Sequence, residues 1–252
     1  MDRRHPGGVR SPRGATVQEG CLTPAARPTA LITGAGRGFG AGLAAALADQ
    51  RWNVLGLVRA TPETLLRIEY LLGDVTDPAV SATIAAALEG HTLDLLVNNA
   101  GVDGGSNLPG EVEAETVMEM MAVHAAGAAR VTRAALPALE RAGTAVVVNV
   151  SSRLGSLTHA GEKRYRNLEQ SIAYRMAKAA LNMYTLASAE VLSGTGVAMC
   201  AVHPGRLRTE MAAPDADLDV ADAVGRLLAW LRSGEALAGR FYSLDTRSDL
   251  PW

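Results

Sequence analysis

The segment that most constrains the fold is an apolar run that ends in a glycine-rich turn and is followed by an alanine-rich stretch. We expect a strand at residues 29–33, a turn that carries Gly34, Gly38 and Gly40, and a helix at residues 41–50. Glycine allows tight turns and close approach to a ligand, and a helix N-terminus offers free N–H groups, so this order suits a bound pyrophosphate. A plain strand-to-helix turn without a ligand is the alternative.

Short aliphatic runs alternate with helical stretches along most of the chain. We expect strands at residues 29–33, 53–58, 68–72, 93–98, 144–150, 197–202 and 239–243. We expect helices at residues 41–50, 78–88, 112–141, 171–192 and 220–231, the third of which can be interrupted. Aliphatic strands that alternate with helices are typical of parallel sheets covered on both faces. The sequence therefore predicts an α/β fold: a single doubly wound Rossmann-type domain with a seven-stranded parallel sheet and helices on both faces.

Residues 1–28 differ in composition from the rest of the chain. They hold five arginines and four prolines, and no apolar segment of the signal-peptide kind follows the Arg3-Arg4 pair. We expect a disordered basic extension over 1–28 and a Rossmann-type catalytic domain over 29–252. A targeting or partner-binding arm is the functional alternative for the extension.

The overall composition excludes several function classes. The 252-residue chain is 48% hydrophobic with a formal charge of −2, which suits one large α/β domain and disfavours nucleic-acid binding. No apolar run is long enough to cross a membrane. The two cysteines, Cys21 and Cys200, lie far apart, and the five histidines show no metal-ligand spacing. We therefore expect no metal, a buried free thiol at Cys200 and a reducing, cytoplasmic compartment.

Ligands of open parallel sheets bind beyond the carboxyl ends of the strands, so the residues after each strand are the candidates. After the second strand, where an NAD site usually has a carboxylate, the chain has Arg59, and Arg37 lies in the glycine turn. Guanidinium groups offer bidentate, charge-assisted hydrogen bonds to a 2′-phosphate. The sequence therefore favours NADP(H) over NAD. Two ordinary surface arginines are the alternative.

Polar or small residues follow the other strands as well. Asp74, followed by Val75, ends the third strand, where a short carboxylate can accept a hydrogen bond from an adenine amino group. Asn-Asn-Ala-Gly at 98–101 can let a ribose pass close by, and a Pro-Gly turn at 204–205 puts Thr209 within reach of a carboxamide. Ser151 and Ser152 end the fifth strand, where hydroxyls can donate to a substrate oxygen. Each motif alone is also compatible with plain turn chemistry.

Tyr174 and Lys178 stand four residues apart in an expected helix and so share one face. A nearby ammonium stabilises a phenolate and lowers the tyrosine pKa, which makes the pair a workable acid/base unit. A lysine that extends past a partly buried tyrosine is the alternative. Tyr165 is the rival tyrosine, but Glu169 four residues later disfavours its phenolate, so Tyr174 is the candidate.

In this order, these motifs resemble the short-chain dehydrogenase/reductase family from about residue 29 to the end. The segments at 151–156, 174–183 and 250–252 are similar to those of C-factor and Sniffer-type carbonyl reductases. The resemblance implies that Ser152 orients a substrate carbonyl, Tyr174 transfers the proton, and Lys178 holds the nicotinamide ribose and tunes Tyr174. It implies that Asn98 braces the sheet near the cofactor. The candidate cofactor-binding residues are Gly34, Arg37, Gly38, Phe39, Gly40, Arg59, Asp74, Val75, Asn98, Ala100, Gly101, Tyr174, Lys178, Pro204, Gly205 and Thr209.

Two departures from the family pattern stand near the candidate site. His124 occupies the place of an asparagine that supports a water chain from the lysine to solvent in the family. Because histidine also bonds water and titrates near pH 6.5, we expect the relay to persist with an altered pH dependence or to be weakened. We therefore count His124 among the catalytic candidates.

Ser152 and Tyr174 are also farther apart than usual, and the extra residues 158–170 predict a polar flap near the site, or a surface loop. The short segment 210–219 predicts an open pocket.

The leading hypothesis is an NADP-dependent carbonyl reductase or alcohol dehydrogenase that acts on a small-molecule carbonyl or alcohol, with Tyr174 as general acid/base. A same-fold dehydratase or epimerase without net redox, and a non-catalytic NADP-binding regulator, are the alternatives. The resemblance also implies a homodimer or homotetramer that packs through the long helices.

Overall fold

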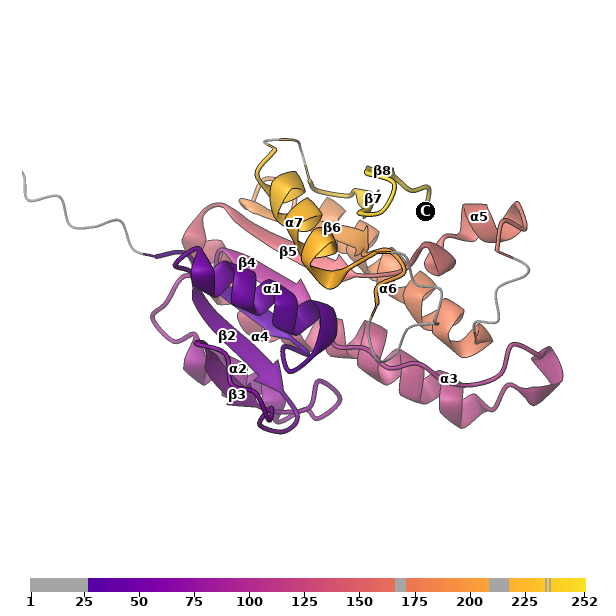
Figure 1. The fold of residues 1–252 in the computed structure, drawn as a ribbon, viewed down its shortest axis with the longest axis horizontal. Helices are drawn as coiled ribbons and strands as arrows, with labels where there is room; N and C mark the ends of the chain where they lie inside the picture. The colour runs from indigo at the N-terminus through magenta and orange to yellow at the C-terminus, as the bar shows by residue number, and fades with distance from the viewer. Residues whose placement is uncertain (1–26, 166–170, 209–217, 234, 236) are drawn as a thin grey trace, which may run out of the picture.

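The computed structural model describes residues 27–165, 171–208, 218–233, 235 and 237–252. These residues form one twisted sheet with helices on both faces (Figure 1). The strands are β1 (Thr29–Thr33), β2 (Asn53–Val58), β3 (Glu69–Leu72), β4 (Leu95–Asn98), β5 (Ala145–Val150), β6 (Val197–His203), β7 (Phe241–Ser243) and β8 (Ser248–Asp249). Nearly all of the predicted basic extension, residues 1–26, lies outside the described residues.

The strand order is β3-β2-β1-β4-β5-β6-β7-β8, which is the doubly wound topology that the sequence predicts. The seven predicted strands pair in parallel. The sheet has an eighth strand that was not predicted, β8, which pairs antiparallel with β7. This edge strand has only two residues, and both are polar and exposed, so no apolar run marks it. A chain reversal at 244–247 places it beside β7.

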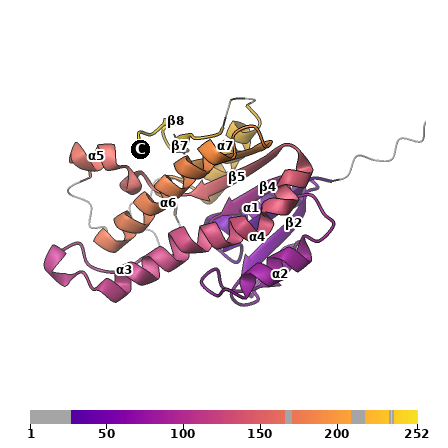
Figure 2. The same cartoon turned by 180° about the vertical axis from the view of Figure 1, so that it is seen from behind.

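The helices are α1 (Gly38–Asp49), α2 (Val80–Ala87), α3 (Ala114–Met121), α4 (Gly127–Ala142), α5 (Leu157–Gly161), α6 (Ile172–Val191) and α7 (Val220–Leu231). Helices α1 and α7 cover one face, and α2, α4 and α6 cover the other, as the two opposite views show (Figures 1 and 2). Side chains alternate along each strand, so Ala30 and Ile32 enter the first layer while Leu31 enters the second. Within the described part of the chain, no helix combines the length and apolarity that a membrane crossing requires.

The helix predicted at 112–141 is interrupted by one π-helical turn, Ala122–Ala126, between α3 and α4. Such a turn adds one residue to the helical repeat and often lies at a functional site. The helix ends at Gly143, whose φ of 71° places it in the left-handed region that favours glycine. The predicted boundaries are therefore nearly right, while the interruption is a single widened turn.

A buried polar chain joins two central strands to two helices. The Asn98 side-chain amide donates to Thr132 Oγ1 at 3.0 Å and to Asn149 Oδ1 at 2.8 Å. The Asn149 amide donates to Thr185 Oγ1 at 2.8 Å, and that hydroxyl donates to the Leu181 carbonyl oxygen at 2.7 Å. The chain thus fixes β4, β5, α4 and α6 relative to one another. Asn98 has the bracing position that the family resemblance implies.

We predict that Thr185→Val lowers the free energy of unfolding by about 1–3 kcal/mol, because it leaves the buried Asn149 amide without an acceptor. Urea denaturation measures the change. The surface substitution Thr92→Val is the matched control and should change stability by much less. Equal stability of the Thr185→Val variant and the unaltered protein would contradict the bracing role of this chain.

Candidate active site

A pocket of about 1550 Å³ lies along the carboxyl ends of the central strands. Loops that follow β1 to β6 line it, together with α6 and the π-helical turn. The predicted site residues that line it are Gly34, Arg37, Gly38, Phe39, Arg59, Asp74, Val75, Ala100, Gly101, His124, Ser152, Tyr174, Lys178, Pro204 and Gly205. Two predicted residues, Gly40 and Asn98, lie behind the lining, and Thr209 falls outside the described residues.

The glycine turn needs the absence of side chains at several positions. Gly34 and Gly38 have φ values of 69° and 56°, which other residues rarely adopt. A Cβ at Gly40 would stand 2.4 Å from the Gly34 carbonyl oxygen, so Gly40 keeps the turn closed from behind. The first turn of α1 carries only glycine, phenylalanine and alanine, so the positive end of the helix dipole meets the pocket without a competing acidic group.

Asn99 ties this turn to the end of β4, which is a role that the amides of the 98–101 segment predict, although Asn99 is not among the candidate cofactor-binding residues. Its side-chain amide donates to the Thr33 and Gly34 carbonyl oxygens at 2.9 and 3.2 Å. Thr33 Oγ1 in turn accepts from the backbone N–H groups of Asn99 and Ala100, both at 2.9 Å. The doubled asparagine at 98–99 was the available signal, because two amides at one strand end can face opposite sides of the sheet.

At the β2–β3 end of the pocket, Asp74 is held as an anion. Its Oδ1 accepts from both the backbone N–H and the hydroxyl of Thr76, each at 2.8 Å. The bond from the Thr76 backbone, with a smaller contribution from the positive charge of Arg59, holds the pKa of Asp74 below its usual value. Arg37 and Arg59 line the same pocket with exposed side chains. This end therefore presents one fixed carboxylate and two guanidinium groups.

At the other end, Ser152, Tyr174 and Lys178 come together. Ser152 follows β5, and its side chain lies close enough to Tyr174 to lower the pKa of that phenol. Lys178 Nζ donates to the Val150 carbonyl oxygen at 2.7 Å and lies 5.5 Å from the centroid of the Tyr174 ring. Close packing makes this possible, since a Cβ at Gly155 would stand 2.7 Å from the Lys178 backbone. Three residues from two elements thus share one wall of the pocket.

The expected effect of Lys178 on Tyr174 needs a correction. Burial raises the pKa of Tyr174 to about 12, and the opposing influence is the Ser152 side chain rather than the ammonium. Burial also lowers the pKa of Lys178 to about 7, which weakens its positive charge. The physical reason is geometric, because Lys178 bonds the Val150 carbonyl and lies over the ring face instead of beside the phenol oxygen.

His124 lies in the π-helical turn, and its ring meets the Tyr174 ring edge-on with centroids 5.5 Å apart. Its Nε2 lies 2.8 Å from the Val102 carbonyl oxygen and 3.4 Å from the Val102 nitrogen; the shorter contact identifies Nε2–H as the donor. Burial lowers the pKa of His124 to about 3. The expectation that it titrates near pH 6.5 is therefore wrong, because the buried imidazole stays neutral.

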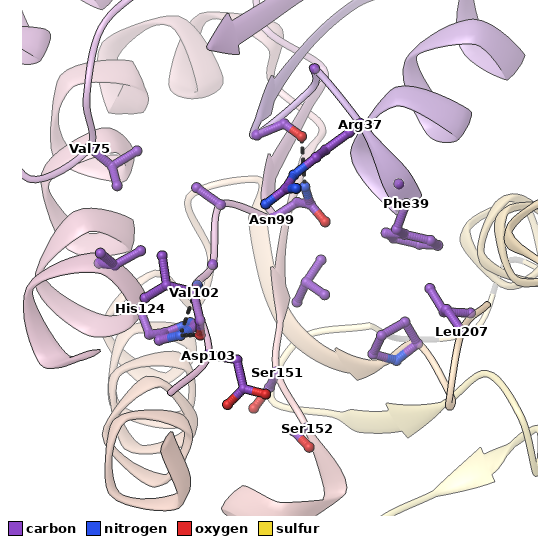
Figure 3. Close-up of a pocket in the computed structure, with 18 of the residues that line it drawn as sticks. Arg37, Phe39, Val75, Asn99, Val102, Asp103, His124, Ser151, Ser152 and Leu207 are labelled. Carbon is purple, nitrogen blue, oxygen red and sulfur yellow. Dashed lines mark hydrogen bonds between the residues drawn. The ribbon is translucent and has the colours of Figure 1, made fainter. Parts of the chain in front are cut away.

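Figure 3 shows further pocket residues that were not among the predicted site residues, among them Val102, Asp103 and Leu207. Ser151, the first serine of the predicted pair, donates through Oγ to Asn182 Oδ1 at 2.5 Å and is turned away from Tyr174. Val102, Asp103 and Leu207 each stand within two positions of a predicted site residue. Extension of every motif by two residues was thus the signal that could have found them.

Two further ionisable groups, Arg153 and His203, line the pocket beside the serine pair. Arg153 lies 3.7 Å from Asp245 and above the ring of Tyr165 at 5.1 Å. His203 Nε2 lies 3.8 Å from the same carboxylate, and burial lowers the pKa of His203 to about 4, so its ring is neutral. No cluster of three potential metal ligands occurs among the residues that the structure describes.

The predicted flap is only partly described. Residues 158–161 lie in α5 and residues 162–165 follow it, and none of them lines the pocket. Residues 166–170 are not described, so the choice between a flap and a surface loop stays a prediction. Thr158 donates through its backbone and hydroxyl to the Trp252 carbonyl oxygen, at 3.0 and 2.7 Å. The rival Tyr165 bonds His159 Nδ1 at 3.1 Å, outside the pocket.

Comparisons with known proteins agree with this arrangement. The family model described as short chain dehydrogenase matches residues 28–218. The chain is 35% identical over 164 residues to the C-signal of Myxococcus xanthus, which covers 64% of this chain and 93% of that protein. The NADPH-bound carbonyl reductase from chicken fatty liver superposes with a TM-score of 0.79 at 27% identity, over 90% of this chain and 100% of that chain. The carbonyl reductase Sniffer of D. melanogaster gives 0.80 at 25% identity, with the same coverage.

The family match spans both ends of the pocket, from the glycine turn to the Tyr174 helix and beyond. The protein is therefore an oxidoreductase that belongs to the short-chain dehydrogenase/reductase family.

Proposed function

We propose that this protein uses NADP(H) to interconvert a small-molecule carbonyl compound and its alcohol, with Tyr174 as the general acid/base. The observation that carries the proposal is the meeting of Ser152, Tyr174 and Lys178 on one wall of a pocket that also contains a phosphate-suited glycine turn. Carbonyl reductases among the superposable structures support the same reaction class.

In reduction, the substrate oxygen would lie between the hydroxyls of Ser152 and Tyr174. The hydride for the carbonyl carbon comes from bound NADPH, whose chemistry belongs to the cofactor. Ser152 holds and polarises the oxygen, and Tyr174 transfers its phenolic proton to it as the C–O bond becomes single. With a pKa near 12, Tyr174 is protonated at neutral pH and ready to act as an acid. Alcohol oxidation needs the phenolate and is therefore favoured as pH rises.

The pocket fits NADP(H) at its other end. The glycine turn would receive the pyrophosphate, and Asp74 would accept from the adenine amino group. Arg37 and Arg59 would bind the 2′-phosphate. The two described residues that directly follow β2, Arg59 and Ala60, include no carboxylate that could accept from a ribose 2′-hydroxyl. Lys178 Nζ, which donates to the Val150 carbonyl oxygen, would also donate to the nicotinamide ribose.

The oligomeric state and the cellular location are also proposals. We propose a homodimer or homotetramer that packs through its long helices, supported by exposed apolar side chains on α6 such as Met183 and Val191, which are 62% and 80% exposed. Light scattering measures this state directly. Action in the cytoplasm is proposed because Cys200, the cysteine that the structure describes, is a buried free thiol; fractionation of the source cell tests it.

We predict that Tyr174→Phe lowers NADPH-dependent reduction of a carbonyl panel by about 10²- to 10⁴-fold, because it removes the transferred proton. The ring that packs against His124 is kept, so NADPH binding should persist in a fluorescence titration. Tyr165→Phe is the matched control, since its hydroxyl bonds His159 outside the pocket, and it should retain turnover. The mechanism is wrong if Tyr174→Phe turns over as fast as the unaltered enzyme.

We predict that Arg37→Ala and Arg59→Ala each weaken NADPH binding by about tenfold, through loss of charge-assisted bonds to the 2′-phosphate. NADH, which lacks this phosphate, should bind with little change. Fluorescence titration with each nucleotide measures both effects, and the exposed Arg67→Ala is the control for a general loss of positive charge. Equal losses for NADH and NADPH would contradict the assignment of these arginines.

We predict that His124→Asn keeps most of the turnover and leaves the pH profile between about pH 5 and 8 unchanged, because the buried imidazole is already neutral there. This replaces the altered profile that a histidine with an ordinary pKa would give. Measurement of kcat against pH tests it, with Tyr174→Phe as the inactive reference. A shift of the acidic or the basic side of the kcat–pH curve in His124→Asn, relative to the unaltered enzyme, would show that His124 titrates during turnover.

A further inference from the structure

The loop between β4 and α3 carries a carboxylate, Asp103, that the proposed reaction does not use. The loop is held on both sides of this residue. Before it, the Val102 carbonyl oxygen accepts from His124; after it, the Ser106 carbonyl oxygen accepts from the Ile172 N–H at 3.1 Å. Asp103 itself accepts from the Gly104 N–H at 2.8 Å. Its carboxylate therefore belongs to a loop of defined position at the edge of the pocket.

Asp103 faces the reacting end of the pocket. It is among the lining residues, and Figure 3 shows its carboxylate directed toward Ser151 and Ser152. Its negative charge also raises the pKa of both Tyr174 and Lys178, so its field reaches the proton-transferring pair. The two arginines proposed for the cofactor phosphate lie at the β1–β2 side instead.

The other ionisable groups that the structure describes near this end have contacts or protonation states of their own. Arg153 is engaged with Asp245 and with the ring of Tyr165. His124 and His203 are neutral because burial lowers the pKa of each. Lys178 is turned to the Val150 carbonyl. Arg206 and Arg208 line the pocket from the loop after β6, and Arg208 pairs with Asp219 at 3.1 Å.

We propose that Asp103 sets the charge preference of the substrate, favouring carbonyl or alcohol compounds that carry a positively charged ammonium group close to the reacting carbon and disfavouring anionic ones. The inference rests on the proposed function, whose substrate it narrows. Attraction across a few ångströms is the physical basis, and because Asp103 is exposed, water screens it. We therefore expect a preference of about three- to tenfold, which weakens as salt is added.

The test uses three alcohols that differ in one terminal group, which is cationic, neutral or anionic: 1-amino-2-propanol, 2-butanol and 3-hydroxybutyrate. Each is oxidised with NADP⁺ at about pH 8.5, where an aliphatic amine stays mostly protonated and oxidation is faster than at neutral pH. The kcat/KM of each alcohol is measured at low and high salt. In the unaltered enzyme we expect kcat/KM to be highest for the cationic alcohol, lower for the neutral one and lowest for the anionic one. Asp103→Asn keeps an oxygen acceptor for the Gly104 N–H, and the cation-to-neutral ratio should fall to near one. Asp103→Lys should reverse the order.

Asp77→Asn is the matched control, because Asp77 is an exposed carboxylate at the start of α2 that does not line the pocket. It should leave the ratio unchanged. If the cation-to-neutral ratio of kcat/KM is unchanged in Asp103→Asn, or does not respond to salt in the unaltered enzyme, the role of Asp103 is wrong. The proposed function still stands in that case, provided that the enzyme binds NADPH and turns over the alcohols. Absence of turnover for all three alcohols in the unaltered enzyme counts against the proposed function and removes the inference with it.

Discussion

The site depends on the close packing of α6 against the end of β5. Gly155 has no Cβ, so the loop after Ser152 lies directly on the Lys178 backbone, and Lys178 Nζ reaches the Val150 carbonyl oxygen. Each contact fixes a residue of one element against the other, and Tyr174 lies one helical turn away. The Asn98–Asn149–Thr185 chain supports the same junction from within the core. The arrangement of Ser152, Tyr174 and Lys178 is therefore a product of strand-to-helix packing rather than of the helix alone.

Burial in this junction also sets the charge state of the pocket. The same desolvation that raises the Tyr174 pKa lowers those of Lys178, His124 and His203. Neutral forms are thus favoured deep in the pocket, while the charged groups Asp103, Arg37 and Arg59 stand at its exposed edge. This division suits a reaction in which a neutral tyrosine supplies the proton deep in the pocket while charged ligand groups are recognised at its edge.

Much of the fold could be predicted because long aliphatic strands and glycine turns depend on local sequence. The seven parallel strands and their helices follow from those patterns, whereas β8 has two polar residues and depends on its pairing with β7. Fifteen of the predicted site residues line the pocket, including Ser152, Tyr174 and Lys178. The protonation states were not predictable, since the pKa values of His124 and Lys178 depend on burial that arises only when distant segments meet. Asp103 and His203 stand within two positions of predicted site residues, but the directions of their side chains depend on how the loops fold.

The π-helical turn at Ala122–Ala126 limits how the length of the α3–α4 region can change. A helix with one extra residue in one turn rotates everything before that turn by about 100° relative to everything after it. Deletion of one residue there would restore an ordinary helix, yet it would carry His124 away from the Val102 carbonyl or turn α3 off its partner α6. Substitutions can therefore accumulate along α3 and α4 more readily than insertions or deletions. Any change of one residue in the length of this turn would alter the pocket wall, because His124 lines it.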